Sequence, residues 1–108
     1  MNLTAEELKK FDEEGYLFFP GKFSLEEAAL LKSEAETVYA TDRKEVWREA
    51  NGVARTAFAA HTYNEAFRRL GAHPRLIDPV SQMLDGDVYM HQYKVNAKAL
   101  AFTLYWCI

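Results

Sequence analysis

The sequence has little cysteine, proline and glycine, and each shortage excludes a class of protein. The single cysteine, Cys107, among 108 residues can form neither an internal disulfide nor a zinc site made of several cysteines. Three prolines and five glycines are too few for a disordered or collagen-like chain. The glycines are scattered singly, so the sequence has no glycine-rich phosphate loop. We therefore expect a folded, disulfide-free protein of the reducing cytoplasm.

Excess positive charge and long apolar runs are also lacking. The 16 acidic and 13 basic side chains give a net charge of −3, so no general basic field attracts nucleic acid or anionic lipid. The longest run without a charged residue, residues 99–108, is about half of what a membrane-spanning helix requires. We expect neither a nucleic-acid nor a membrane partner. A chain of 108 residues is long enough for one domain, or a piece of one.

Two capping boxes predict the first two helices. Thr4 with Glu7, and Ser24 with Glu27, have the spacing at which a hydroxyl and a carboxylate satisfy each other's backbone amides. The first helix is predicted over Ala5–Glu14 and ends at Gly15, and the second runs to about Tyr39. The second helix is expected to bury one face, made by Leu30, Leu31, Ala35 and Val38.

Two more helices are predicted in the middle of the chain. One covers residues 64–70 and ends at Gly71, and the other opens at His73-Pro74 and ends at Asp85-Gly86. Pro79 inside the latter predicts a kink or a late start. The expected buried face of this helix contains Leu76, Ile77, Val80, Met83 and Leu84.

Strands are expected in two places. Residues 16–19, closed by Pro20-Gly21, predict a brief buried strand. Residues 88–98 alternate with a period of two, so Gln92, Lys94, Asn96 and Lys98 share one face while Tyr89, His91, Tyr93 and Val95 share the other. Residues 41–51 are densely charged and aperiodic, which favours a loop or a frayed helix end.

The sequence contains no complete catalytic or metal-binding motif. Iron(II) oxygenases use two histidines and a carboxylate, commonly beginning with His-x-Asp or His-x-Glu, and none of the three histidines has that neighbour. Their simplest interpretations are a loop residue for His61, a helix-entry residue for His73 and a core or interface residue for His91. Cys107 in its apolar surroundings is interpreted as structural.

The strongest candidate site is one face of the predicted strand 88–98. Gln92, Asn96 and Lys98 project from the same side, and three such groups can converge on a small anion such as a dicarboxylate. The alternative is a solvent-facing strand that carries ordinary polar side chains, and the pattern alone favours this alternative.

Several blocks of sequence, in order, resemble the phytanoyl-CoA dioxygenase family, and most of all its bacterial branch that includes ectoine hydroxylases. These blocks are GVARTAFAAH at 52–61, RRL and HPRL between 68 and 76, and VYMHQYKVNAKA at 88–99. The resemblance extends over most of residues 1–99. It implies an α+β fold in which N-terminal helices precede the first strands of a double-stranded β-helix, or jelly roll, and the barrel is incomplete in this chain.

The resemblance also implies an activity and residue roles. Family members oxidise a small molecule with Fe(II) while converting 2-oxoglutarate to succinate. By this resemblance Lys98 and Asn96 are expected at 2-oxoglutarate, Gln92 at the substrate, and Arg55 in the pocket wall.

The sequence departs from the family after Ala99. The expected His-x-Asp, the second histidine and the arginine that anchors 2-oxoglutarate are absent from residues 99–108. We therefore expect one partial domain, 1–108, with a divergent tail at 99–108, which is inactive alone, binds no iron alone and self-associates through the tail. Two other hypotheses stay open: a non-enzymatic helical interaction module, and one half of a split enzyme.

Overall fold

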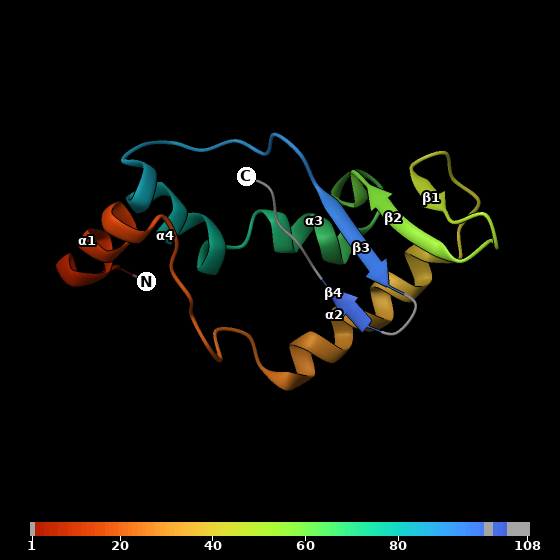
Figure 1. Cartoon of the computed structure of the whole chain (residues 1–108), viewed down its shortest axis with the longest axis horizontal. Helices are drawn as coiled ribbons and strands as arrows, with labels where there is room; N and C mark the ends of the chain where they lie inside the picture. Colours follow the sequence, from red (N-terminus) through yellow and green to blue (C-terminus); the bar gives the residue numbers. More distant parts are fainter. Residues whose placement is uncertain (1, 99–100, 104–108) are drawn as a thin grey trace.

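A computed structural model describes residues 2–98 and 101–103 of the chain. The elements follow in the order α1 (Ala5–Glu14), α2 (Leu25–Tyr39), β1 (Val46–Arg48), β2 (Ala54–Phe58), the 3-10 helix η1 (Ala60–Thr62), α3 (Glu65–Gly71), α4 (Pro74–Leu84), β3 (Lys94–Lys98) and β4 (Ala101–Thr103). Helices and one antiparallel sheet thus make an α+β arrangement (Figure 1).

The sheet has the strand order β1-β2-β3-β4, and each neighbouring pair is antiparallel. Its register sets Val46 opposite Ala57, and Ala57 opposite Val95. A shift of register beside Trp47 leaves one extra residue on β2, which is a β-bulge. The chain leaves the sheet after β2 and returns as β3 only after η1, α3 and α4.

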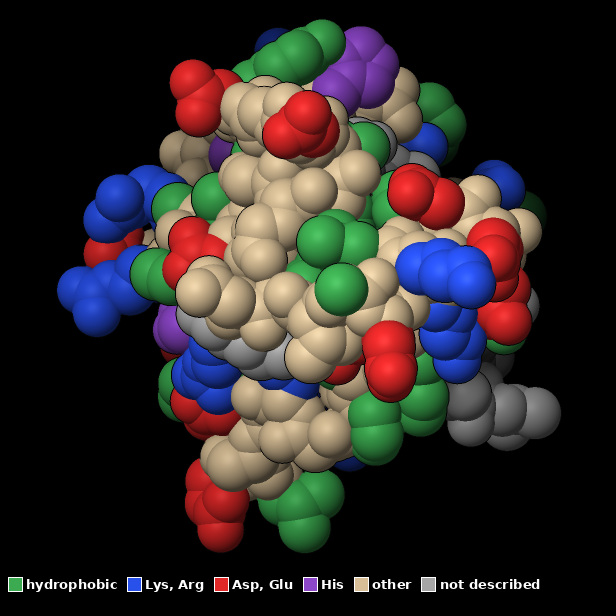
Figure 2. Space-filling model, turned by 90° about the vertical axis from the view of Figure 1, so that its left-hand side faces the viewer, with side chains coloured by type: hydrophobic (Ala, Val, Ile, Leu, Met, Phe, Trp, Pro, Cys, Tyr) green, Lys and Arg blue, Asp and Glu red, His purple; other side chains and the backbone are tan. Residues whose placement is uncertain are grey.

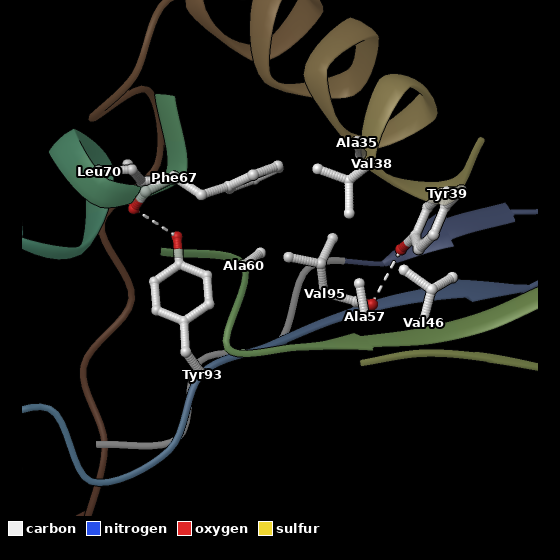
Figure 3. Close-up of a cluster of buried hydrophobic side chains, with 10 residues drawn as sticks. All are labelled: Ala35, Val38, Tyr39, Val46, Ala57, Ala60, Phe67, Leu70, Tyr93 and Val95. Carbon is white, nitrogen blue, oxygen red and sulfur yellow. Dashed lines mark hydrogen bonds between the residues drawn. The ribbon is translucent and has the colours of Figure 1, made fainter. Parts of the chain in front are cut away.

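One face of the sheet packs against α2 and α3 and forms the core. The buried side chains, shown in Figure 3, are Ala35, Val38, Tyr39, Val46, Ala57, Ala60, Phe67, Leu70, Tyr93 and Val95. Both tyrosines donate their hydroxyl to a backbone carbonyl, Tyr39 to Val95 and Tyr93 to Phe67, each at 2.9 Å. These bonds satisfy polar groups that burial alone would leave unpaired.

At the other end of the molecule α1 lies against α4 (Figure 1). Leu3 is buried there, and its amide donates to Gln82 Oε1 at 2.8 Å. Figure 2 shows this end, where acidic and basic side chains are interspersed with hydrophobic ones. No helix in the described ranges is both long and apolar enough to cross a membrane.

The helix predictions are confirmed at the caps. Thr4 and Ser24 form their capping boxes, and α1 ends in left-handed Gly15. Asn64 caps α3 and His73 caps α4. The helix α3 extends to include Gly71, and α4 begins at Pro74 with the buried Pro79 inside it, so the predicted late start is wrong. The early start is stable because proline at the first helical position lacks an amide that would be unpaired anyway.

The predicted buried faces of α2 and α4 are partly wrong. Leu30 and Leu84 are each 58% exposed, whereas Ala35 and Val38 are buried as expected. The periodicity of a sequence identifies the apolar face of a helix. Whether every residue of that face is buried depends on how far the neighbouring elements extend along the helix.

The strand predictions need larger corrections. Residues 16–19 form no strand, and Phe18 is 80% exposed. The long predicted strand is regular only over Lys94–Lys98, and residues 88–93 are irregular. Conversely, the predicted loop 41–51 contains β1, and the sequence does not predict β2 (Ala54–Phe58). A strand forms where a partner takes its hydrogen bonds, and that information is not local.

Candidate functional site

The face of the sheet opposite the core carries the candidate site. We call it the outer face and define it by Trp47, Thr56, Phe58, Lys94 and Asn96. The register sets Thr56 opposite both Trp47 and Asn96, and Phe58 opposite Lys94. Because side chains alternate along a strand, these residues lie on the side away from the buried Ala57 and Val95.

Asn96 makes the most specific contact of the outer face. Its Oδ1 accepts a hydrogen bond of 2.9 Å from the hydroxyl of Thr56, the directly opposite residue on β2. Thr56 is only 9% exposed. The carboxamide of Asn96 is thus held in one orientation by a neighbour that is itself fixed.

Next to this pair lie a cation and two aromatic rings. The Lys94 ammonium is 5.6 Å from the centroid of the Phe58 ring, a cation–π distance. The Phe58 ring meets Trp47 edge to face at 4.7 Å, and Trp47 remains 56% exposed. The outer face therefore combines a positive charge, an oriented amide and an accessible aromatic surface.

The site residues expected from the sequence do not include Trp47, Thr56, Phe58 or Lys94. The alternation within residues 88–98 does place Lys94 on the same face as Asn96, so this pattern could have identified Lys94 as a site residue. Thr56 and Phe58 gave no signal because β2 was not recognised as a strand, and only the pairing of β2 with β3 brings them to Asn96 and Lys94.

The other expected site residues have different outcomes. Lys98 is the last residue of β3. It follows Asn96 by two residues, which is a position on the same face of a strand. Its side chain lies outside the described part of the structure. Gln92 is exposed in the irregular segment before β3, so its strand assignment is wrong and its expected role stays a prediction.

Arg55 is not brought to Asn96. It lies where the β-bulge interrupts the pairing of β1 with β2, and its guanidinium forms an exposed ion pair of 3.9 Å with Glu49. A bulge changes the direction of a side chain in a way that simple alternation does not predict. The pocket-wall role of Arg55 therefore stays a prediction.

The three histidines occupy separate environments. His61, in η1, is half-buried and stacks on Tyr93 with ring centroids 4.7 Å apart. His73 caps α4, because its Nδ1 accepts from the amide of Arg75 at 3.1 Å, so the helix-entry interpretation is confirmed. His91 is exposed, so its interpretation as a core residue is wrong. Its interpretation as an interface residue stays a prediction.

The metal-binding side chains of the described residues do not form an iron site. Within residues 2–98 and 101–103, no group of three or more His, Cys, Asp or Glu side chains lies close enough to hold a metal ion. The two-histidine, one-carboxylate set of iron(II) oxygenases therefore does not fit these residues. The expectation that the chain alone binds no iron stays a prediction, and Cys107 lies outside the described residues.

Comparison with known proteins gives a consistent result. The ectoine dioxygenase of Stutzerimonas stutzeri is 35% identical to the chain over 112 residues, covering 96% of the chain and 37% of the relative. The chain is similar to ectoine dioxygenases. A second enzyme, L-proline trans-4-hydroxylase of Streptomyces griseoviridis, is 30% identical over 90 residues, which cover 82% of the chain and 34% of that enzyme. No family model matches the chain.

Solved structures extend the likeness to the fold. The crystal structure of EctD from S. alaskensis with 2-oxoglutarate and 5-hydroxyectoine matches with a TM-score of 0.77 at 29% identity, covering 87% of this chain and 35% of that one. The structure of EctD from S. alaskensis with bound Fe matches with a TM-score of 0.78 at the same identity and coverage. The chain thus spans about a third of the length of these relatives.

Proposed function

We propose that the outer face is one wall of the active site of an Fe(II)- and 2-oxoglutarate-dependent dioxygenase that hydroxylates a small molecule. The single observation that carries this proposal is the Asn96 amide, oriented by Thr56 beside the Lys94 cation. A solvent-facing strand does not need a buried threonine to hold its asparagine, and hydrogen-bond donors beside a cation suit a carboxylate ligand.

In this proposal the residues of β3 bind the co-substrate. Asn96 donates to a carboxylate of 2-oxoglutarate and Lys98 supplies a charge, while Gln92 contacts the substrate. The iron and oxygen would supply the oxidation, and we assign no step at the metal to the described residues, since they do not provide its ligands. Arg55 is retained as a pocket-wall candidate only.

The substrate class follows from the relatives in part. An ectoine dioxygenase and a proline hydroxylase both act on small, polar, nitrogen-containing molecules, and a molecule of that kind is the proposed substrate here. The resemblance to the phytanoyl-CoA dioxygenase family belongs to this proposal too. The narrower identity of the substrate is tested below with the two molecules named by the relatives.

A chimera tests the proposal directly. Residues 1–98 of this chain would be followed by the matching remainder of the S. stutzeri enzyme, and succinate would be measured after adding 2-oxoglutarate with ectoine or with L-proline. We expect succinate that depends on one of the two substrates. A folded, iron-loaded chimera that forms no succinate with either one would contradict the proposal.

Two variants of the chimera assign the roles. Lys98→Ala should weaken 2-oxoglutarate binding about tenfold to a hundredfold, because one charge-assisted contact contributes about 1.5–3 kcal/mol. Gln92→Ala should raise KM for the substrate and leave 2-oxoglutarate binding unchanged. Lys9→Ala is the matched control, because Lys9 is exposed on α1 and pairs only with Glu13 among the ion pairs of the described residues. If Lys98→Ala leaves the affinity for 2-oxoglutarate unchanged, Lys98 is an ordinary strand residue that does not bind the co-substrate.

The split-enzyme hypothesis uses the same wall and differs only in how the remainder is supplied. The exposed Trp47 and its neighbours suit coverage by further polypeptide from the same chain or from another one. Adding the remainder of the S. stutzeri enzyme as a separate chain would test this arrangement. Succinate formation from the mixture would support it.

A further inference from the structure

The hydrogen bond between Thr56 and Asn96 determines which way the side-chain amide of Asn96 points. The hydroxyl of Thr56 donates to Oδ1 of Asn96 at 2.9 Å, so the oxygen of the carboxamide faces β2. A carboxamide carries its acceptor on one side and its two donor hydrogens on the other. Fixing the oxygen therefore fixes the NH2 group, which is directed away from Thr56.

Thr56 is well suited to hold this orientation. Its side chain is β-branched, which restricts rotation about χ1, and it is 9% exposed. The two residues are direct partners in the register of β2 and β3, so the backbone fixes the distance between them. Among the hydrogen bonds of the described residues, the one from Thr56 is the only one that involves the side chain of Asn96. The residue opposite Asn96 on β4 is Thr103, whose side chain lies outside the described part of the structure.

We propose that Thr56 is a positioning residue that presents the Asn96 NH2 group as a donor to a carboxylate of 2-oxoglutarate. This inference rests on the proposed function and extends it to a residue that itself makes no contact with the ligand. Without the bond, the carboxamide can rotate by half a turn and set its oxygen against the carboxylate, where two acceptors repel each other.

The test uses the full chain and 2-oxoglutarate as the probe. Affinity would be measured by titration followed by NMR, together with residual dipolar couplings of the Asn96 NH2 group in the free chain. Thr56→Val keeps the shape and removes the hydroxyl. We expect it to weaken 2-oxoglutarate binding about threefold to tenfold, the range that corresponds to one neutral hydrogen bond, and to average the couplings between two orientations.

Two further variants separate positioning from folding. Thr56→Ser restores a hydroxyl and should recover both the affinity and the single orientation. Thr37→Val is the matched control, because Thr37 Oγ1 bonds only to the carbonyl of Ser33 within α2 among the described contacts, and α2 covers the opposite side of the sheet. Thermal unfolding of all variants identifies any that fail to fold.

A double-mutant cycle completes the test. In an Asn96→Ala background, Thr56→Val should cost no additional affinity, because the group that Thr56 positions is absent. If neither the unmodified chain nor the iron-loaded chimera binds 2-oxoglutarate, the proposed co-substrate site itself fails. If only the chimera binds it, the same variants are compared in the chimera. If the unmodified chain binds it and Thr56→Val binds equally well with unchanged couplings, only the positioning role of Thr56 is overturned.

Discussion

The phenolic hydroxyl of Tyr39 on α2 donates to the carbonyl of Val95 on β3 at 2.9 Å, across 56 residues of sequence. Both side chains are buried in the core shown in Figure 3. The bond fastens the helix layer to the strand that carries Asn96. Burial, with a smaller contribution from Tyr63, raises the pKa of Tyr39 to about 12.

Removing this hydroxyl should destabilise the fold at neutral pH and change its alkaline behaviour. Tyr39→Phe should lower the free energy of unfolding by about 1 kcal/mol, since a buried carbonyl loses its donor. A raised pKa in the folded state adds stability that is complete below pH 10, the ordinary tyrosine value, and is lost as pH rises through about 12. Urea unfolding between pH 8 and 12 measures both effects.

The exposed Tyr16 provides the matched control for this prediction. It is 61% exposed, so Tyr16→Phe should change neither the stability nor its decline at alkaline pH. An equal alkaline decline in Tyr39→Phe and the unmodified chain would show that the Tyr39 hydroxyl is not its cause.

A second prediction concerns the contact between the starts of α2 and α4. The hydrogen bond from Arg75, reinforced by the backbone of Ser24, lowers the pKa of Glu27 to about 2. Arg75 donates to Glu27 Oε2 at 2.9 Å and stacks on Phe23 at 4.4 Å. A lowered pKa in the folded state adds stability above pH 4.5 that is lost as pH falls toward about 2.

Glu27→Gln should therefore reduce stability at pH 7 and flatten its dependence on pH between 4.5 and 2. Acid titration followed by circular dichroism measures this dependence. The neighbouring Glu26, exposed in the same helical turn, provides the control, and Glu26→Gln should leave the acid transition in place. A transition in Glu27→Gln as steep as that of the unmodified chain would contradict the assignment to this ion pair.

A third prediction concerns Gly71 at the end of α3. A Cβ at this position would lie 3.0 Å from Cε2 of Tyr93 and 3.3 Å from Cε of Met90. The Tyr93 ring has little freedom to move, because its hydroxyl bonds to Phe67 and His61 stacks on it. Overpacking of this kind costs about 1–3 kcal/mol, more than the up to about 1 kcal/mol of helix propensity that alanine adds.

Gly71→Ala should thus lower the melting temperature although it improves helix propensity. Calorimetry of Gly71→Ala beside Gly86→Ala measures the difference, since a Cβ at Gly86 meets nothing within 4 Å. A Gly71→Ala chain as stable as the unmodified one would mean that Tyr93 moves aside at little cost.

The fourth prediction is self-association through the apolar tail. Its residues 104–108, Leu-Tyr-Trp-Cys-Ile, lie outside the described structure and combine high β-propensity with no charge. A chain that ends at Thr103 keeps β4 and should sediment as a smaller species than the full chain. Replacing residues 104–108 by serine is the control for length, and a reducing agent excludes a disulfide through Cys107. Equal sedimentation of all three would exclude residues 104–108 of the tail as the cause.

The sequence by itself determined the helices and the site residues that β3 contributes. Capping boxes at Thr4 and Ser24 are local devices, and a helix satisfies its own backbone within a few residues, so α1 and α2 form as predicted. The alternation along β3 also placed Asn96 and Lys94 on one face correctly, because the period of two is a property of the strand itself.

Tertiary structure alone decided which extended segments became strands and what met Asn96. Residues 16–19 have the composition of a strand and form none, whereas the charged segment around Val46 forms β1. A strand needs a partner for its amides and carbonyls, and here β2 is the partner of both β1 and β3. That pairing brings Thr56 to Asn96 across 40 residues of chain, a separation at which no local pattern carries information.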